Sequence, residues 1–167
     1  MYQAAVILHI VAAVTWVGGM LFLVLVLVPL TRKEMDMPGQ GAVLLRQAAR
    51  RFLPVAWTSI VVLVVTGVFI AWDHWGIRPG NFFTSGGHFF RTLQVKIGLV
   101  VLVIGLSLFH DFVLGPYVVR QLENRPAAGG PPRPSRARML LLVLARINLL
   151  LLLAIIALAV TLIRPCR

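Results

Sequence analysis

Residues 3–30 read QAAVILHIVAAVTWVGGMLFLVLVLVPL, a run long enough to cross a bilayer as one helix. His9 is the one ionisable side chain inside this run. Helical spacing places five further residues on the face of His9, namely Ala12, Ala13, Trp16, Gly19 and Met20. An ionisable group at membrane depth indicates a functional site. The first hydrophobic run therefore predicts where the chemistry of the chain lies.

The composition indicates an integral membrane protein. Of the 167 residues, 59% are hydrophobic and 13% are charged, whereas soluble domains carry roughly 25% charged residues. We expect one transmembrane domain over residues 1–167. The net charge of +11 does not indicate nucleic-acid binding, because most Lys and Arg residues flank hydrophobic runs and set topology there. Cys166 is the only cysteine, which excludes a disulfide within the chain and a thiolate metal cluster.

Four hydrophobic runs predict four membrane-spanning helices. They cover about residues 3–30, 52–72, 92–115 and 139–163, and each is near or above the roughly 20 residues that a spanning helix needs. The expected fold is all-α, an integral membrane four-helix bundle. Residues 42–51 of the first loop, AVLLRQAARR, predict a short amphipathic helix that lies on the cytoplasmic surface. No internal repeat stands out, so an inverted-repeat transporter gains no support.

The basic residues predict the orientation in the membrane. Ten lie in the first and third loops, against four in the second loop and the C-terminal tail. Both termini are therefore expected outside, on the periplasmic side of a bacterial-type inner membrane. The outer loop between the second and third helices, DHWGIRPGNFFTSGGHFFR at residues 73–91, combines aromatic pairs and glycines with His74 and His88. Two interpretations stay open, a cap over the outer mouth of the bundle and an anchor at the interface.

The third run carries a polar stripe at helical spacing. Lys96, Ser107 and His110 share one face of that helix. Lys96 lies roughly 7 Å from the outer end of its helix and His9 roughly 9 Å from the outer end of the first helix. The two side chains are therefore predicted at similar depth. Lys96 could instead snorkel to the interface, and His110 could be an ordinary interfacial residue.

Two polar layers follow from these depths. The outer layer combines His9 and Lys96 beneath His74 and His88. His110 lies roughly 21 Å beyond Lys96 along the helix axis. It belongs to an inner layer, toward which Arg146 of the fourth helix reaches.

The leading functional hypothesis is a haem b membrane protein of redox type. Imidazoles in a four-helix core ligate haem iron, and nearby Lys or Arg residues pair with propionates. His9 is the predicted axial ligand, and Trp16 lines the flat face on which a macrocycle could lie. Lys96 would pair with a propionate, ligate iron or position the substrate.

Further residues extend this haem hypothesis. His74 or His88 could supply the second axial ligand, and His110 with Arg146 a second haem or a quinone site. The expected partners are the lipid bilayer and a quinol or other membrane redox partner. A homo-oligomer stays open.

Two other classes of function remain. A neutral imidazole also suits copper, so a copper import or homeostasis permease with His9, His74 and His88 as metal ligands is the alternative. Met20 is the only methionine well inside a predicted helix, which favours haem over copper on ligand supply. A scaffold of a respiratory complex is the third class, and it predicts that neither metal nor haem copurifies.

The sequence also resembles a known group of membrane proteins. HIVAAVTWVGGMLFL (residues 9–23) resembles the H-x3-A-x2-W-x-G pattern of copper-resistance protein D-type domains and HemJ-type protoporphyrinogen oxidases. ARRFLPVAWTSIVVLVVTGVFIAW (49–72), VKIGLVVLVIGLSLFHDFVLGP (95–116) and RINLLLLLAIIALAVTLIRP (146–165) are similar to their later helices.

The resemblance implies roles for two residues. In HemJ-type proteins the first-helix histidine and the third-helix lysine are associated with b-type haem and activity, which implies haem-related roles for His9 and Lys96. Leu149 stands where HemJ-type proteins have an acidic residue, and this difference favours the copper-resistance-D-type relatives.

Overall fold

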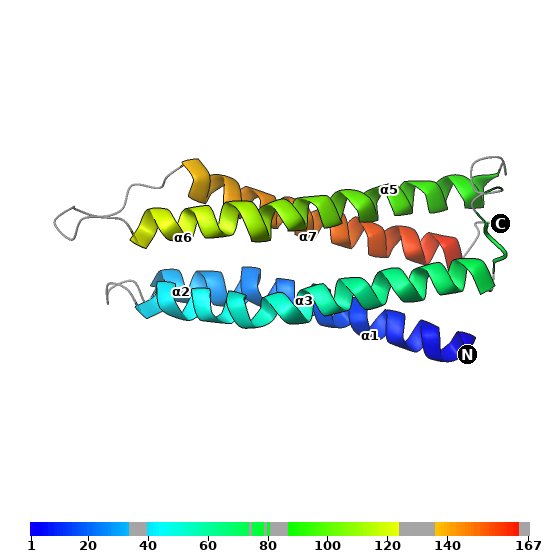
Figure 1. Cartoon of the computed structure of the whole chain (residues 1–167), viewed down its shortest axis with the longest axis horizontal. Coiled ribbons are helices and arrows are strands. Elements are labelled where there is room, and N and C mark those ends of the chain that lie inside the picture. The colour runs from blue at the N-terminus through cyan, green and yellow to red at the C-terminus, as the bar shows by residue number, and fades with distance from the viewer. Residues whose placement is uncertain (34–39, 74, 79, 81–86, 124–135, 164–167) are drawn as a thin grey trace. The chain divides into compact units, whose positions relative to one another are not determined.

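The computed structural model describes residues 1–33, 40–73, 75–78, 80, 87–123 and 136–163 (Figure 1). The elements in the described residues are helical: α1 (Tyr2–Leu21), η1 (Phe22–Leu27), α2 (Val28–Lys33), α3 (Gln40–Asp73), α5 (His88–Leu108), η3 (Phe109–Leu114), α6 (Gly115–Glu123) and α7 (Arg136–Ile163). The stretches long and apolar enough to cross a membrane are Tyr2–Thr31, Val43–Asp73, Phe90–Val118 and Met139–Val160. The predicted all-α membrane fold is confirmed at this level. The location of the termini stays a prediction.

The chain divides into two compact units, Met1–Phe90 and Arg91–Arg167. In the first unit α3 runs back along α1, and in the second unit α7 runs back along α5, η3 and α6 (Figure 1). Each unit is thus a long helical hairpin. The single domain expected from the sequence stays a prediction.

Residues 42–51 are helical, as predicted, but they do not form a short helix of their own. Those residues are the first turns of α3, which continues for 34 residues and contains Pro54. The residues before Pro54 are mainly strong helix formers, Ala, Leu, Arg and Gln, with no glycine after Gly41. Nothing in the local sequence therefore ends the helix at the membrane surface.

A glycine closes the other end of α3. The Ile77 N–H donates to the Ala71 carbonyl oxygen at 3.0 Å. Gly76 has φ +59, a conformation that glycine adopts without the steric cost that a Cβ brings. The chain therefore leaves α3 by a defined turn.

Each unit contains a six-residue π-helical segment. The segments are η1 (Phe22–Leu27) and η3 (Phe109–Leu114). Pro29 and Pro116 each lie two residues beyond the end of a segment. A proline inside a helix lacks an N–H, and its ring clashes with the carbonyl four residues earlier, here that of Leu25 or Phe112. A widened turn moves this carbonyl away from the ring, which accounts for both segments.

The two π segments reveal a repeat that the sequence analysis missed. Adding 87 to a residue number in 1–33 carries η1 onto η3 and Pro29 onto Pro116. Eight positions are then identical, Ile10/Ile97, Val14/Val101, Gly18/Gly105, Leu21/Leu108, Phe22/Phe109, Val26/Val113, Leu27/Leu114 and Pro29/Pro116. Leu27 and Leu114 are also equally buried, at 7% exposure each.

The same relation pairs His9 with Lys96. Each residue precedes the start of its π segment, Phe22 or Phe109, by the same number of residues. The two ionisable side chains therefore occupy equivalent positions in the two hairpins. The matched depth of the two side chains in a membrane stays a prediction.

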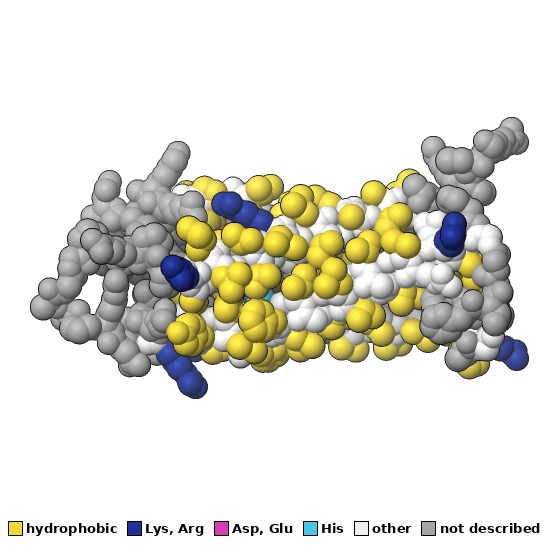
Figure 2. All heavy atoms as spheres, turned by 90° about the horizontal axis from the view of Figure 1, so that it is seen from above, with side chains coloured by type: hydrophobic (Ala, Val, Ile, Leu, Met, Phe, Trp, Pro, Cys, Tyr) yellow, Lys and Arg dark blue, Asp and Glu magenta, His cyan; other side chains and the backbone are white. Residues whose placement is uncertain are grey.

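The surface of the described helices is largely apolar. On the face drawn in Figure 2, hydrophobic side chains dominate, and Lys and Arg side chains are few. Val14, Val65, Val101 and Leu150 are all more than 60% exposed. Such side chains suit contact with lipid, where hydrocarbon replaces water as the solvent. Lipid can cover most of each helix, so only a narrow stripe of side chains on each helix needs to pack against its neighbour.

Candidate functional site

A hydrogen bond joins the two helices of the first hairpin at His9. The His9 Nδ1 atom lies 2.8 Å from the Thr66 Oγ1 atom. His9 is half-buried on α1, and Thr66 is buried on α3 at 7% exposure. The hydroxyl of Thr66 therefore joins α3 to α1.

The hydrogen bonds of Thr66 determine which nitrogen of His9 carries the proton. The Thr66 hydroxyl lies 2.6 Å from the Val62 carbonyl oxygen and 3.4 Å from that of Leu63. A carbonyl only accepts, so the single hydroxyl proton is directed to this pair, chiefly to Val62. Toward His9 the hydroxyl oxygen must then accept, and His9 Nδ1 must donate. A neutral imidazole in this arrangement carries its lone pair on Nε2, the nitrogen that can bind a metal.

Gly19 allows the helices of this hairpin to approach closely. A Cβ at Gly67 would lie 3.5 Å from His9 Cε1, an ordinary packing distance, so the imidazole lies near Gly67 and a side-chain methyl would fit there. A Cβ at Gly19 would overlap the ring of Phe52. Small residues at such contacts are typical of helix packing in membranes. The His9 face of α1 is therefore the face that packs on α3.

The flat face predicted beside His9 is enclosed in the structure. Ala12 and Trp16 are both buried, at 7% exposure each. Ala13, Gly19 and Met20 are half-buried. The predicted role of Trp16 beside a cofactor stays a prediction.

The other residues predicted for the outer layer are only partly described. Lys96 is half-buried on α5. His88 is the first residue of α5, and its side chain lies outside the described part. His74 lies outside the described residues altogether. The roles of Lys96, His74 and His88 stay predictions.

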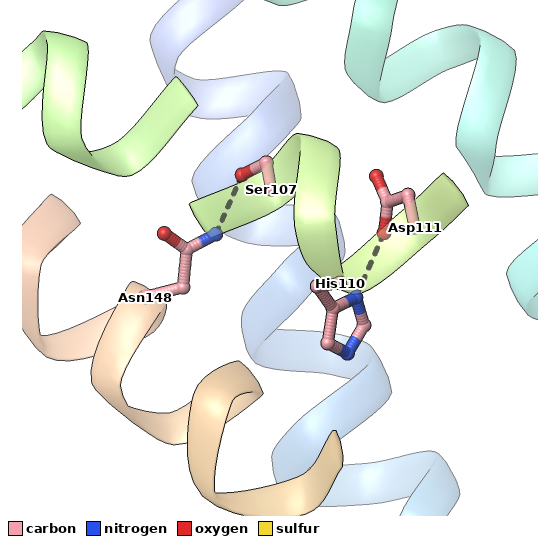
Figure 3. A network of polar contacts seen from close by, with 4 residues as sticks. All are labelled: Ser107, His110, Asp111 and Asn148. Atoms are coloured by element: carbon pink, nitrogen blue, oxygen red, sulfur yellow. Dashed lines mark hydrogen bonds and ion pairs between the residues drawn. The ribbon is translucent and has the colours of Figure 1, made fainter. Parts of the chain in front are cut away.

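The second hairpin contains a polar contact of its own (Figure 3). The Asn148 Nδ2 group of α7 donates to Ser107 Oγ of α5 at 2.7 Å. Both side chains are buried, at 4% and 5% exposure. Asn148 Oδ1 has no hydrogen-bond partner among the described residues. Ser107 belonged to the predicted stripe, but its bond to Asn148 was not foreseen.

The predicted inner layer separates into two environments. His110 Nδ1 lies 2.8 Å from Asp111 Oδ1 within η3 (Figure 3). Arg146 is exposed on α7. The buried polar residue of α7 is Asn148, two positions later. The pairing of His110 with Arg146 stays a prediction.

Among the residues that the structure describes, no three His, Cys, Asp or Glu side chains gather into a group that could hold a metal ion. Of the three predicted metal ligands, His9 is the one whose side chain the structure describes.

Comparisons with known proteins identify the family. The family model described as "Copper resistance protein D" matches residues 46–162, which is more than half of the chain. The chain belongs to this family, as the sequence resemblance implied. It is also 29% identical over 126 residues to an uncharacterized protein of Aquifex aeolicus (strain VF5), covering 75% of this chain and 78% of that protein. No solved structure matches the chain.

The matched residues include Thr66, Lys96 and Asn148, whereas α1 precedes them. The interest of His9 therefore rests on its geometry within the first hairpin. The family and the four apolar helices together indicate a multi-pass membrane protein.

Proposed function

We propose that this member of the copper resistance protein D family is a copper permease of the inner membrane, in which His9 binds the ion through Nε2 during passage. The observation that carries the proposal is the hydrogen bond of His9 Nδ1 to Thr66, 2.8 Å long. Metal-binding histidines usually donate their second ring N–H to a neighbouring group, which fixes the ring and its tautomer. His9 is held in this way inside an apolar helix.

The family description supports copper as the cargo. Copper binds neutral imidazole well, and a carrier must bind its ion weakly enough to release it. With both termini outside, His9 would lie near the outer surface, where His74 and His88 would be the first ligands that an incoming ion meets. We propose this sequence of ligands, from His74 and His88 to His9, as the path of the ion.

Copper accumulation in cells tests this function. Cells that lack their own copper uptake would express the wild-type chain, His9→Asn or Ile10→Ala, and cell-associated copper would be measured under copper limitation. Asparagine offers an amide N–H near the position of Nδ1, so it keeps a donor for Thr66 but has no nitrogen lone pair. Ile10 is exposed beside His9, which makes Ile10→Ala the matched control.

We expect copper accumulation with the wild type and Ile10→Ala, and background accumulation with His9→Asn at equal membrane abundance. Equal accumulation with His9→Asn and the wild type would contradict the role of His9. The same variants therefore separate a ligand from a packing histidine.

Haem b redox chemistry is the second candidate. A histidine held through Nδ1 is equally suited to ligate haem iron through Nε2. The family description favours copper instead. An absorbance spectrum of the purified protein decides between them, because stoichiometric haem b with a Soret band lost in His9→Asn would replace the copper proposal.

A further inference from the structure

We infer that Thr66 is a positioning residue, which holds His9 in the Nδ1–H tautomer and so presents the Nε2 lone pair as the metal ligand. The inference rests on the proposed function for the identity of the metal. The tautomer itself follows from the hydrogen bonds of Thr66.

The first step is the direction of the Thr66 hydroxyl. Its oxygen lies 2.6 Å from the carbonyl of Val62, one helical turn earlier on α3. This bond is short, and the carbonyl cannot donate, so the Thr66 hydroxyl donates its proton to this carbonyl of the α3 backbone. A local bond of this kind is common for threonine in membrane helices.

The second step is the consequence for His9. The Thr66 oxygen has lone pairs remaining, and the imidazole Nδ1 lies 2.8 Å from it. A lone pair on Nδ1 would face a lone pair on Oγ1, which is repulsive. The proton must therefore be on Nδ1. The Nδ1–H group then donates to the Thr66 oxygen, and the Thr66 hydroxyl donates to the Val62 carbonyl oxygen. In a neutral ring the basic nitrogen is then Nε2.

The third step is the placement of the ring. Gly67 follows Thr66, and a Cβ built there would lie 3.5 Å from the imidazole Cε1, so the ring lies beside the helix turn that carries Thr66. The bond of Nδ1 to Thr66 restricts rotation of the ring. Restricting a ligand before the metal arrives lowers the entropy cost of binding.

A purely structural interpretation makes a different prediction. If Thr66 only joins α1 to α3, its loss should change stability but not the tautomer or the copper affinity. Serine keeps the hydroxyl and valine keeps the shape without it. Thr66→Ser and Thr66→Val therefore separate positioning from packing.

Nitrogen-15 NMR of histidine-labelled protein in nanodiscs reads the tautomer directly without metal. The chain has four histidines, and the signal missing from His9→Asn identifies His9. We expect the Nδ1–H pattern in the wild type and in Thr66→Ser. We expect a shift toward the Nε2–H pattern in Thr66→Val, where Nδ1 loses its acceptor. A wild-type His9 protonated on Nε2 would overturn the inference.

Copper titration against a competing chelator supplies the second readout. Loss of such an outer contact typically weakens metal binding by roughly 10–100-fold, and we expect this range for Thr66→Val with recovery in Thr66→Ser. A Thr66→Val protein with wild-type tautomer and wild-type affinity would overturn the positioning role. If Thr66→Val fails to fold, the wild-type spectrum alone still decides the tautomer.

The two proposals fail in different ways. If His9→Asn binds copper as the wild type does, the proposed function falls, and the role of Thr66 toward a metal falls with it. If His9→Asn loses copper but Thr66→Val does not, His9 remains the ligand and only the positioning role of Thr66 is lost.

Discussion

The imidazole Nδ1 of His9 lies 2.8 Å from the hydroxyl oxygen of Thr66, although 57 positions separate the two residues in the chain. The contact joins α1 to α3 within an apolar helix pair. In such surroundings each polar group needs a partner. One hydrogen bond therefore serves both the stability of the hairpin and the orientation of the proposed ligand.

We predict a measurable coupling between these two residues. A double-mutant cycle with His9→Ala and Thr66→Val should give a coupling free energy of about 0.6 kcal/mol, and no more than about 1.7 kcal/mol, as for hydrogen bonds between membrane helices. Reversible unfolding in mixed micelles measures it. Strictly additive effects would show that the bond contributes nothing to stability.

Gly41 should tolerate no side chain, unlike Gly18. A Cβ at Gly41 would lie 2.7 Å from the Thr31 carbonyl oxygen, whereas a Cβ at Gly18 meets nothing within 4 Å. Gly41→Ala should destabilise the first hairpin by about 1–3 kcal/mol because backbone must move. Gly18→Ala is the matched control, and the helix preference for alanine should make it neutral or stabilising by up to about 1 kcal/mol. A Gly41→Ala protein as stable as the wild type would refute the close contact of α2 with α3.

Gly19 and Phe52 should show compensation. An added methyl at Gly19 overlaps the far end of the Phe52 ring, which has to turn away, so Gly19→Ala should lower the unfolding free energy by about 1 kcal/mol, the low end of the cost of overpacking. The smaller side chain of Phe52→Leu leaves room for the methyl. In the Phe52→Leu background we therefore expect a smaller cost of Gly19→Ala, and an unchanged cost would contradict this packing.

Ser107 and Asn148 should respond asymmetrically to mutation. Ser107→Ala removes the acceptor of Asn148 Nδ2, and Asn148 Oδ1 already lacks a partner among the described residues. Leaving a buried amide unsatisfied costs about 1–3 kcal/mol. The double variant Ser107→Ala/Asn148→Leu removes both polar groups, so we expect it to be more stable than Ser107→Ala alone. Unfolding measurements that rank the double variant lower would contradict this account.

The sequence predicts the helices well because membrane spans are long and almost purely apolar. The first, third and fourth predicted spans agree with the structure to within a few residues. The second begins earlier because Arg46, Arg50 and Arg51 lie on the same continuous helix as the apolar residues that follow. Hydropathy locates the apolar part of a helix, whereas helix propensity and helix-breaking residues determine where the helix starts.

The sequence alone identified one of the two residues of the candidate site. His9 stands out because it is ionisable within a span, but Thr66 is one of several hydroxyls in α3 that can bond to their own backbone. Its partnership with His9 depends on how α1 and α3 align, which one-dimensional periodicity does not give. The Ser107–Asn148 bond was missed for the same reason.

The repeat was hidden by composition. Leucine and valine recur throughout all four helices, so identities among them carry little information. Phe22 and Phe109, with Pro29 and Pro116 seven residues later, are the sequence signal that could have revealed it. The π segments make this signal visible because the two prolines disturb the two helices at the same place.

Copper flux into vesicles tests the central claim most directly. Purified wild-type protein, His9→Asn and Ile10→Ala would be reconstituted at equal density, and copper entry would be followed with a trapped chelating dye. We predict flux for the wild type and Ile10→Ala, with His9→Asn reduced to the rate of protein-free vesicles. Wild-type flux through His9→Asn would contradict the account.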